Sequence, residues 1–383
     1  MKILITSDLF TVKTNGVVTS LRNLWEEMTK KGHDVKILTL SEGRHSHKDE
    51  TGNVYFICSM PIGIYPDLRM PIKYRHRLIK EIIEWKPDVI HSQCEFFSYQ
   101  FALHISKRTG APIVHTYHTM YEDYAQYITK NRKISKYVIG KFSKQRLGKA
   151  ERVIAPTHKV EKLLEGYDVE PPISVVPSGI SLDQHKIRLD PEERLQMRRS
   201  LGIEDDCVLL LNLGRLGNEK NIEELVGLYS KATRHYDKIR FMIVGDGPAR
   251  ENLESLSKEL GLEKKIIFTG RVDPSEVQKY YQLGDVFVSA STSETQGLTY
   301  IEAAANGLPL LCRQDICLDD VIEQGENGYA YESEEEFLAY IDDIVNNSEW
   351  REHAAKRSEE IANSFDKSIF GDAVEEIYKS VIE

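Results

Sequence analysis

The chain has 383 residues, enough for two domains with separate cores, and its formal net charge is −10. No apolar run approaches the roughly 20 residues of a membrane-spanning helix, and no secretory pattern precedes the first apolar run, residues 3–7. The five cysteines are scattered and odd in number, and Cys312 and Cys317 lack a second Cys/His pair at zinc spacing. We therefore expect a cytoplasmic protein with reduced thiols.

The net charge hides an asymmetry between the two halves. Residues 1–178 carry 27 Lys/Arg and 19 Asp/Glu, or +8, whereas residues 179–383 carry 23 and 41, or −18. This distribution predicts that the basic half binds an anionic partner or surface.

Short apolar runs alternate with helical patterns along the first half, which is typical of an α/β domain. We expect buried strands at residues 3–7, 34–40, 54–58, 87–91 and 112–118, and helices at 17–31 and 72–85.

Gly16 precedes the first helix, where glycine lets the backbone approach a ligand closely. His118 closes the fifth strand, at the sheet edge where ligands bind in such domains. The alternatives are that Gly16 only forms a turn before the helix, and that His118 is a structural histidine whose hydrogen bonds are made within the protein. His115 and His118 are not a convincing metal site, because residues three apart on a strand face opposite ways.

The most unusual segment runs from Gln126 to Arg152, with nine basic residues and one acid, Glu151. Four apolar residues fall within roughly 80° on a helical wheel: Tyr127, Ile134, Val138 and Phe142. A basic amphipathic helix of this kind suits an anionic membrane surface. The lysines that we expect to bind the membrane are Lys130, Lys133, Lys136, Lys141 and Lys144. The alternative is a helix that packs its apolar face on the protein core and exposes its basic residues to solvent. No helix-turn-helix or aromatic RNA-binding pattern supports nucleic acid.

After a boundary near residue 180, the second half begins with a helix at 191–201 and a strand at 208–213. Gly214-Arg215-Leu216-Gly217-Asn218-Glu219-Lys220-Asn221 then leads into a helix at residue 222. A strand, a glycine-bearing turn, two cations and a helix start together predict a phosphate pocket formed around Arg215 and Lys220. Further strand-and-turn units follow at 241–248 and 266–272.

A second junction joins an expected strand at 286–290 to an expected helix at 298–306. Its turn holds Glu294, Gln296 and Gly297, and the helix begins at Leu298 and contains Glu302. A helix N-terminus at this sheet edge can receive a phosphate, and a carboxylate can accept two hydrogen bonds from a vicinal diol such as a ribose. A capping loop followed by a solvated helical glutamate is the alternative.

Glu294-x7-Glu302, preceded by Gly214-Arg215-x4-Lys220-Asn221, resembles the signature of glycosyltransferase family 4, retaining enzymes of the GT-B fold. The resemblance spans nearly the whole chain. It implies an α/β protein with two Rossmann-like parallel-sheet domains facing across a cleft. We expect an acceptor-binding domain at 1–180, a nucleotide-sugar-binding domain at 181–365, and a C-terminal helix at 366–383 that returns to the first domain.

The resemblance also implies roles for the site residues. Arg215 and Lys220 neutralise the diphosphate of a UDP-sugar. Glu302 holds the ribose, whereas Glu294 and the backbone at 296–298 hold the sugar. The catalytic set is Arg215, Lys220, Glu294 and His118; the donor-binding set is Gly16, Gln296, Gly297, Leu298, Glu302, Arg271 and Val272.

The sequence has no Asp-x-Asp motif at a strand end to hold a metal against phosphates. We therefore expect metal-independent transfer, without a cofactor.

The expected acceptor is a membrane lipid. Residues 293–300 and 115–124 resemble those of bacterial diacylglycerol glucosyltransferases. Together with the basic segment, they predict transfer of a hexose, expected to be glucose from UDP-glucose, to diacylglycerol at the inner face of the cell membrane. The alternatives are a family 4 enzyme with a soluble or polysaccharide acceptor, a GT-B sugar-nucleotide epimerase, and a non-catalytic nucleotide-sugar sensor.

Overall fold

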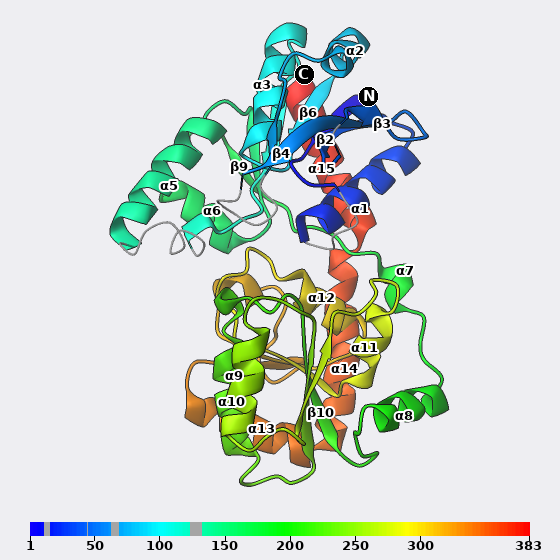
Figure 1. Ribbon diagram of the computed structural model, residues 1–383, viewed down its shortest axis with the longest axis vertical. Coiled ribbons are helices and arrows are strands. Elements are labelled where there is room, and N and C mark those ends of the chain that lie inside the picture. Colours follow the sequence, from blue (N-terminus) through cyan, green and yellow to red (C-terminus); the bar gives the residue numbers. More distant parts are fainter. Residues whose placement is uncertain (11–15, 44, 63–68, 123–131) are drawn as a thin grey trace. The chain divides into compact units, whose positions relative to one another are not determined.

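A computed structural model describes residues 1–10, 16–43, 45–62, 69–122 and 132–383, with residues 132–135 described by their backbone alone. The chain forms two compact units, each with a central sheet (Figure 1). The N-terminal unit consists of Met1–Ile180 together with Lys367–Glu383, and the C-terminal unit is Ser181–Asp366. None of the helices in the described ranges is long and apolar enough to cross a membrane.

The sheet of the N-terminal unit has the strand order β3-β4-β2-β1-β6-β7-β8-β9, and β5 pairs with β4. Its pairs are parallel except for β3–β4 and β4–β5. The strands are β1 (Lys2–Thr6), β2 (Asp34–Ser41), β3 (His47–Lys48), β4 (Val54–Pro61), β5 (Arg69–Pro71), β6 (Val89–Ser92), β7 (Ile113–Thr116), β8 (Arg152–Ala155) and β9 (Ile173–Val175). Because β1 lies between β2 and β6, the chain turns to opposite sides of β1, which creates a ligand-binding crevice in sheets of this kind.

Helices cover both faces of this sheet. They are α1 (Gly16–Lys30), α2 (Arg77–Trp85), α3 (Phe97–Thr109), α5 (Arg132–Leu147), α6 (His158–Glu165) and α15 (Lys367–Ile382). One buried apolar cluster joins the sheet to α2, α3 and α6, and a separate cluster joins it to α1 and α15. The prediction that a helix begins at residue 72 was wrong. The strand β5 ends at Pro71, and the helix begins only at Arg77, where the His76 side chain accepts the N–H of Leu78 to cap α2.

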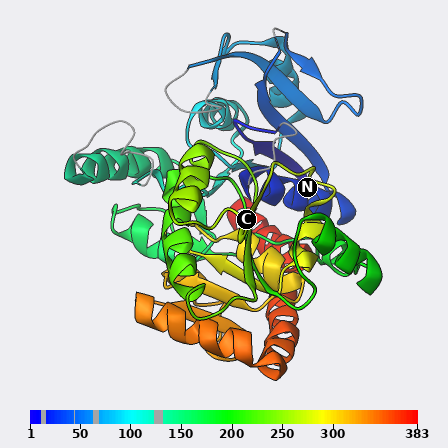
Figure 2. The same ribbon diagram turned by 60° about the horizontal axis from the view of Figure 1, so that its bottom comes forward.

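The sheet of the C-terminal unit is wholly parallel, in the order β12-β11-β10-β13-β14-β15. Its strands are β10 (Val208–Leu213), β11 (Ile239–Val244), β12 (Ile266–Gly270), β13 (Val286–Ser289), β14 (Leu310–Arg313) and β15 (Gly328–Tyr331). Its helices are α7 (Leu182–His185), α8 (Pro191–Ser200), α9 (Ile222–Ala232), α10 (Arg250–Glu259), α11 (Val277–Leu283), α12 (Leu298–Ala305), α13 (Glu334–Asn346) and α14 (Ser348–Ala362). Figures 1 and 2 show helices on both faces of this sheet.

The last helix, α15, packs on the N-terminal unit although it follows the C-terminal unit in sequence. Phe370, Val374 and Tyr378 are buried against α1 and the sheet. Gly371 allows close approach, because a Cβ there would lie 2.8 Å from the Cβ of Glu27 on α1. The tyrosine hydroxyl also contacts Nδ1 of His91 on β6, at 2.6 Å.

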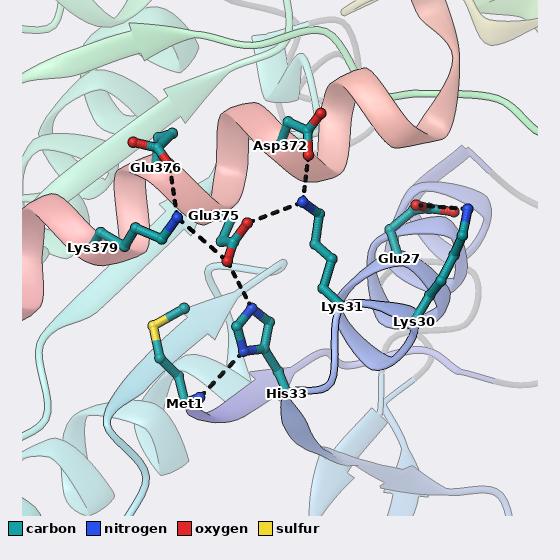
Figure 3. Close-up of polar contacts among 9 residues, drawn as sticks. All are labelled: Met1, Glu27, Lys30, Lys31, His33, Asp372, Glu375, Glu376 and Lys379. Carbon is teal, nitrogen blue, oxygen red and sulfur yellow. Dashed lines mark hydrogen bonds and ion pairs between the residues drawn. The ribbon is translucent and has the colours of Figure 1, made fainter.

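Charged side chains hold α15 at its outer edge (Figure 3). Glu375 accepts hydrogen bonds from Lys31 at 3.0 Å and from His33 Nε2 at 3.1 Å, and Lys379 lies 3.5 Å away. Lys31 also pairs with Asp372. Hydrogen bonds from Lys31 and His33 and the charges of Lys31 and Lys379 lower the pKa of Glu375 to about 2, with Lys31 contributing most. Glu375 is therefore the central anion of this attachment.

We expect Glu375→Gln to lower the free energy of unfolding of the N-terminal unit by about 2–3 kcal/mol at pH 7, because hydrogen bonds to a charged acceptor are lost. The pKa of Glu375 is lower in the folded state than its ordinary value of 4.5. Its contribution is therefore complete above pH 4.5 and decreases as the pH falls toward 2. Denaturant titrations at pH 7 and pH 3 should show a smaller difference between the proteins at pH 3. Glu376→Gln, on the same helix but 71% exposed and paired with Lys379, is the matched control. Equal losses in the two variants would contradict the role of Glu375.

Candidate active site

The carboxyl ends of β10 and β13 form the centre of the C-terminal unit's sheet edge. β11 and β12 continue the sheet from β10, whereas β14 and β15 continue it from β13. The edge between these two strands is thus the topological switch point, where ligands bind in open parallel sheets. The turns after the two strands are tied together, because the Ser293 hydroxyl donates to the carbonyl of Glu219 at 3.1 Å.

The two predicted phosphate-binding cations lie in the turn after β10, and each is paired with a carboxylate. Lys220 Nζ lies 2.6 Å from Glu294 Oε1, and the two side chains are 28% and 16% exposed. Arg215 pairs with Glu219, whose side chain is almost completely buried. Lys220 and Glu294, 74 residues apart in the sequence, thus meet at the switch point.

Gly297 sets the geometry of the turn that enters α12. Its φ is +75°, in the left-handed region, and a Cβ there would collide with the ring of Tyr300. The glycine is therefore required by both conformation and space. Gln296, beside it, is buried, and α12 begins at Leu298, so the N–H groups of the first helical turn lie at this edge.

Glu302 is not a solvated helical glutamate. The Tyr281 hydroxyl donates to its Oε2 at 2.8 Å, and burial raises the pKa of the carboxyl to about 7. The hydrogen bond from Tyr281 acts in the opposite direction but is the smaller effect. Glu302 therefore changes its charge near neutral pH and has one oxygen held in position by a buried tyrosine.

The turns after β10, β11 and β12 are joined through their backbones. Gly214 N–H donates to Val244 at 3.0 Å, and Gly245 N–H donates to Gly270 at 3.0 Å. A Cβ on Gly245 would collide with the carbonyl of Gly214, so glycine is needed for this close approach. The predicted donor-binding residues Arg271 and Val272 directly follow β12, with Arg271 exposed and Val272 partly exposed.

The N-terminal unit holds the other predicted site residues at its own sheet edge. His118 follows β7, and its Nε2 lies 2.6 Å from Gln93 Oε1. Burial lowers the pKa of His118 to about 3, so the imidazole is neutral at physiological pH. Gly16 is the first residue of α1 and is exposed, whereas its neighbour Asn15 lies outside the described residues.

Two buried carboxyl groups of the N-terminal unit, Asp8 and Glu95, were not predicted from the sequence. Glu95, in the loop after β6, pairs with His115 Nε2 at 3.1 Å and accepts the Tyr121 hydroxyl. Asp8 follows β1, and burial raises its pKa to about 6. Its Oδ1 accepts the N–H of Ser98 at 2.6 Å, and its buried Oδ2 has no partner within the described part of the chain. Their position after predicted strands was the signal that could have revealed them.

The predicted membrane-binding segment forms α5, but its apolar residues do not all lie on a free face. Phe142 stacks on Phe96 of the N-terminal unit, at 5.8 Å between ring centroids, whereas Val138 is 57% exposed. The predicted single apolar edge was therefore wrong for Phe142, because α5 uses that ring to pack on its own unit. Tyr127 and Lys130 lie outside the described residues, as do the side chains of Lys133 and Ile134.

The lysines on the described part of α5 face solvent. Lys136 and Lys141 are exposed, and the side chain of Lys144 is 43% exposed. Lys136 lies 3.8 Å from Glu122, and Lys144 lies 3.8 Å from Asp168; exposed pairs of this kind contribute little stability. No group of three or more His, Cys, Asp or Glu side chains suited to a metal ion was found among the residues described.

Comparison with known proteins assigns each half to a known domain. Residues 14–184 match the Glycosyltransferase Family 4 domain, and residues 193–361 match the domain described as Glycosyl transferases group 1. In structure, the chain is similar to Anabaena HepE in complex with UDP and glucose, with a TM-score of 0.77 and 18% identity over 99% of this chain and 100% of that chain. The fold is therefore GT-B, as expected.

The curated relatives are similar over the full length. Alpha-monoglucosyldiacylglycerol synthase of Streptococcus pneumoniae is 32% identical over 100% of this chain and 86% of its own length. The synthase of the same name from Acholeplasma laidlawii is 30% identical over 100% and 98%. The chain belongs to glycosyltransferase family 4 and is a glycosyltransferase.

Proposed function

We propose that this enzyme transfers glucose from UDP-glucose to diacylglycerol with retention of configuration. The observation that carries the proposal is the site at the β10–β13 switch point, where Lys220, in the same turn as Arg215, pairs with Glu294 just before α12, and Glu302 lies on that helix. The relatives supply the acceptor, since they are named as monoglucosyldiacylglycerol synthases. HepE, which shares the fold, has been solved with UDP-glucose.

The site offers hydrogen-bonding or charged groups that suit the diphosphate, the ribose and the hexose of a UDP-sugar. The diphosphate is anionic and suits Lys220, Arg215 and the N–H groups of α12. The ribose offers two hydroxyl donors and suits the carboxylate of Glu302. Glu294 and the backbone at 296–298 would bind the sugar hydroxyls, with Lys220 holding Glu294 in position.

The chemical step breaks the bond between the anomeric carbon and the diphosphate oxygen. A bond to the oxygen of an acceptor hydroxyl replaces it, and the hydroxyl proton passes to the departing diphosphate. Negative charge grows on the leaving UDP, so cations and N–H groups that are already in position lower the barrier. The neutral imidazole of His118 can donate or accept a hydrogen bond at a sugar hydroxyl without adding charge. These groups require no cofactor.

A donor panel tests the function. UDP release and products would be measured for UDP-glucose and other UDP-sugars, with and without vesicles that contain diacylglycerol. We expect a monoglucosyl lipid, with UDP release that depends on diacylglycerol. Glycosylation of a soluble sugar instead would support a family 4 enzyme with a soluble acceptor. Turnover to an epimeric sugar nucleotide, or UDP-glucose binding without turnover, would support the epimerase or the sensor.

Peripheral membrane association at the cytoplasmic face is the second part of the proposal. α5 presents Lys136, Lys141 and Lys144 to solvent, with Tyr137 and Val138 71% and 57% exposed between them. Basic side chains interleaved with exposed apolar ones match the composition of an interfacial helix.

Replacing Lys136, Lys141 and Lys144 by Glu should weaken sedimentation with phosphatidylglycerol vesicles by about 100-fold or more. Each lysine near an anionic surface contributes about 1 kcal/mol, and the Debye length of about 10 Å at 0.1 M salt limits its range. Raising the salt concentration should therefore weaken vesicle binding by the parent protein in the same way. In the matched control, three exposed lysines of the C-terminal unit are replaced by Glu: Lys258, Lys264 and Lys356. Equal binding by the α5 variant and the parent protein would remove α5 from the membrane contact.

A further inference from the structure

A cavity of about 610 Å³ opens along α3 in the N-terminal unit. Its lining includes four aromatic rings, Tyr74, Phe96, Phe97 and Phe101, and two guanidinium groups, Arg75 and Arg146. No carboxylate lines the cavity in the part of the chain that the structure describes. Such a lining suits a ligand with a large apolar body and oxygen acceptors.

The aromatic wall follows from the helical periodicity of α3. Phe97, Phe101 and His104 are spaced i, i+4 and i+7, so they lie along one side of the helix and line the same cavity. The ring of Tyr74 lies 5.2 Å from that of Phe101, and the ring of Phe96 lies 5.8 Å from that of Phe142 on α5. Two of the lining rings, Tyr74 and Phe101, thus pack against each other, and a third, Phe96, is supported by a ring of α5.

Two basic side chains, Arg75 and Arg146, line the cavity beside these rings. The Arg146 guanidinium lies 5.2 Å from the centroid of the Phe142 ring, and its backbone carbonyl accepts the Tyr99 hydroxyl at 2.8 Å. Arg75 is exposed beside Tyr74. A guanidinium is a multiple hydrogen-bond donor and cannot accept, so the groups that fit here are acceptors such as ester carbonyls.

One end of the cavity adjoins the buried polar cluster of the same unit. The ring of Phe96 lies 5.4 Å from that of Tyr121, whose hydroxyl donates to Glu95. Glu95 follows Gln93, the partner of His118, in the loop after β6. The Phe96 end of the cavity thus adjoins the carboxyl group of Glu95 through the ring of Tyr121.

From these contacts we propose that the α3 cavity is the binding site for the acyl chains of an acylglycerol acceptor. This inference rests on the proposed function and names the place of its lipid. The acyl chains lie against the four rings, the ester carbonyls accept hydrogen bonds from Arg146 and Arg75, and the free hydroxyl points toward the polar cluster at Phe96. A phospholipid in the same cavity is the competing occupant.

The test uses the full chain and a diacylglycerol that carries a photoactivatable diazirine in one acyl chain. After irradiation in neutral vesicles, mass spectrometry should place the label on peptides that contain residues 96–104 or 74–77. The double variant Tyr74→Ser, His104→Trp removes an exposed ring and narrows the cavity, and both positions are exposed enough to tolerate the change. It should reduce this labelling at least fivefold and raise the acceptor KM at least fivefold. The matched control is Ile72→Ser, which removes an exposed apolar side chain outside the cavity lining and should change neither value.

Further readouts separate this inference from the proposed function. UDP-glucose affinity and vesicle sedimentation should be unchanged in the double variant, since the donor site and α5 are intact. Labelling outside the cavity, or an unchanged acceptor KM in the double variant, would overturn the inference. So would stronger competition by phosphatidylglycerol than by unlabelled diacylglycerol. Labelling of α3 without any glucosyl lipid would support the cavity as a lipid site and would refute the proposed reaction alone.

Discussion

Lys220→Ala should lower kcat at least a hundredfold while raising the Kd of UDP-glucose less than about tenfold. Charge grows on the diphosphate as the glycosidic bond breaks, so a cation contributes most at the transition state. Removal of one such preorganised group costs about 10²–10³ in kcat in other enzymes. The variant also leaves Glu294 without the partner that lies 2.6 Å away, which disturbs the sugar-binding side of the site.

Steady-state kinetics and calorimetry would separate the two effects. Lys220→Arg keeps a cation near Glu294 and should restore part of the rate. Lys231→Ala is the matched control, because Lys231 also pairs with a glutamate of the same unit, Glu334, but lies at the surface on α9. A rise in the donor KM with kcat unchanged would show that Lys220 acts in ground-state binding only.

Glu302→Gln should weaken UDP-glucose binding about tenfold to a hundredfold and should remove its pH dependence near neutrality. Each hydrogen bond from a ribose hydroxyl to a charged acceptor is worth about 1.5–3 kcal/mol. Because burial raises the pKa of Glu302 to about 7, the acceptor is largely protonated at pH 6 and largely ionised at pH 8. The affinity of the parent protein should therefore rise with pH through 7 and level off above it.

The ligand for this titration is UDP-glucose, because its esterified diphosphate has no ionisation near pH 7, unlike free UDP. Glu259→Gln, at the exposed end of α10, should reproduce the affinity and the pH profile of the parent protein. If the Glu302→Gln variant retained both, Glu302 would have no part in binding the ribose.

The sequence predicted those parts of the fold that depend on local patterns. β10 has the predicted bounds and α15 fills the predicted range to within one residue at each end, since continuous apolar runs and helical periodicity fix such elements locally. The helix expected from residue 72 begins at Arg77, because Arg69–Pro71 pair with β4 and the His76 side chain caps the helix. Local propensity carries no information on such a pairing.

Long-range contacts explain what the sequence could not predict about the candidate site. Motif spacing indicated Lys220 and Glu294 separately, but their ion pair depends on two loops meeting at the switch point. The raised pKa of Glu302 depends on its burial in the folded unit, which outweighs the opposing hydrogen bond from Tyr281 on another helix. Asp8 and Glu95 carry no motif, and only the packing of β1, β6 and β7 shows that they are buried.

The return of α15 to the N-terminal unit has a consequence for the order in which the protein folds during synthesis. Residues 181–366 are contiguous, so the C-terminal unit has its whole sequence as soon as residue 366 leaves the ribosome. The N-terminal unit is translated first, yet its core lacks Phe370, Val374 and Tyr378 until α15 emerges. The core of the N-terminal unit can therefore be completed only after α15 has been synthesised, and until then an apolar face of α1 stays uncovered. A nascent chain stalled before residue 367 should expose that face to chaperones and proteases even after the second half has folded.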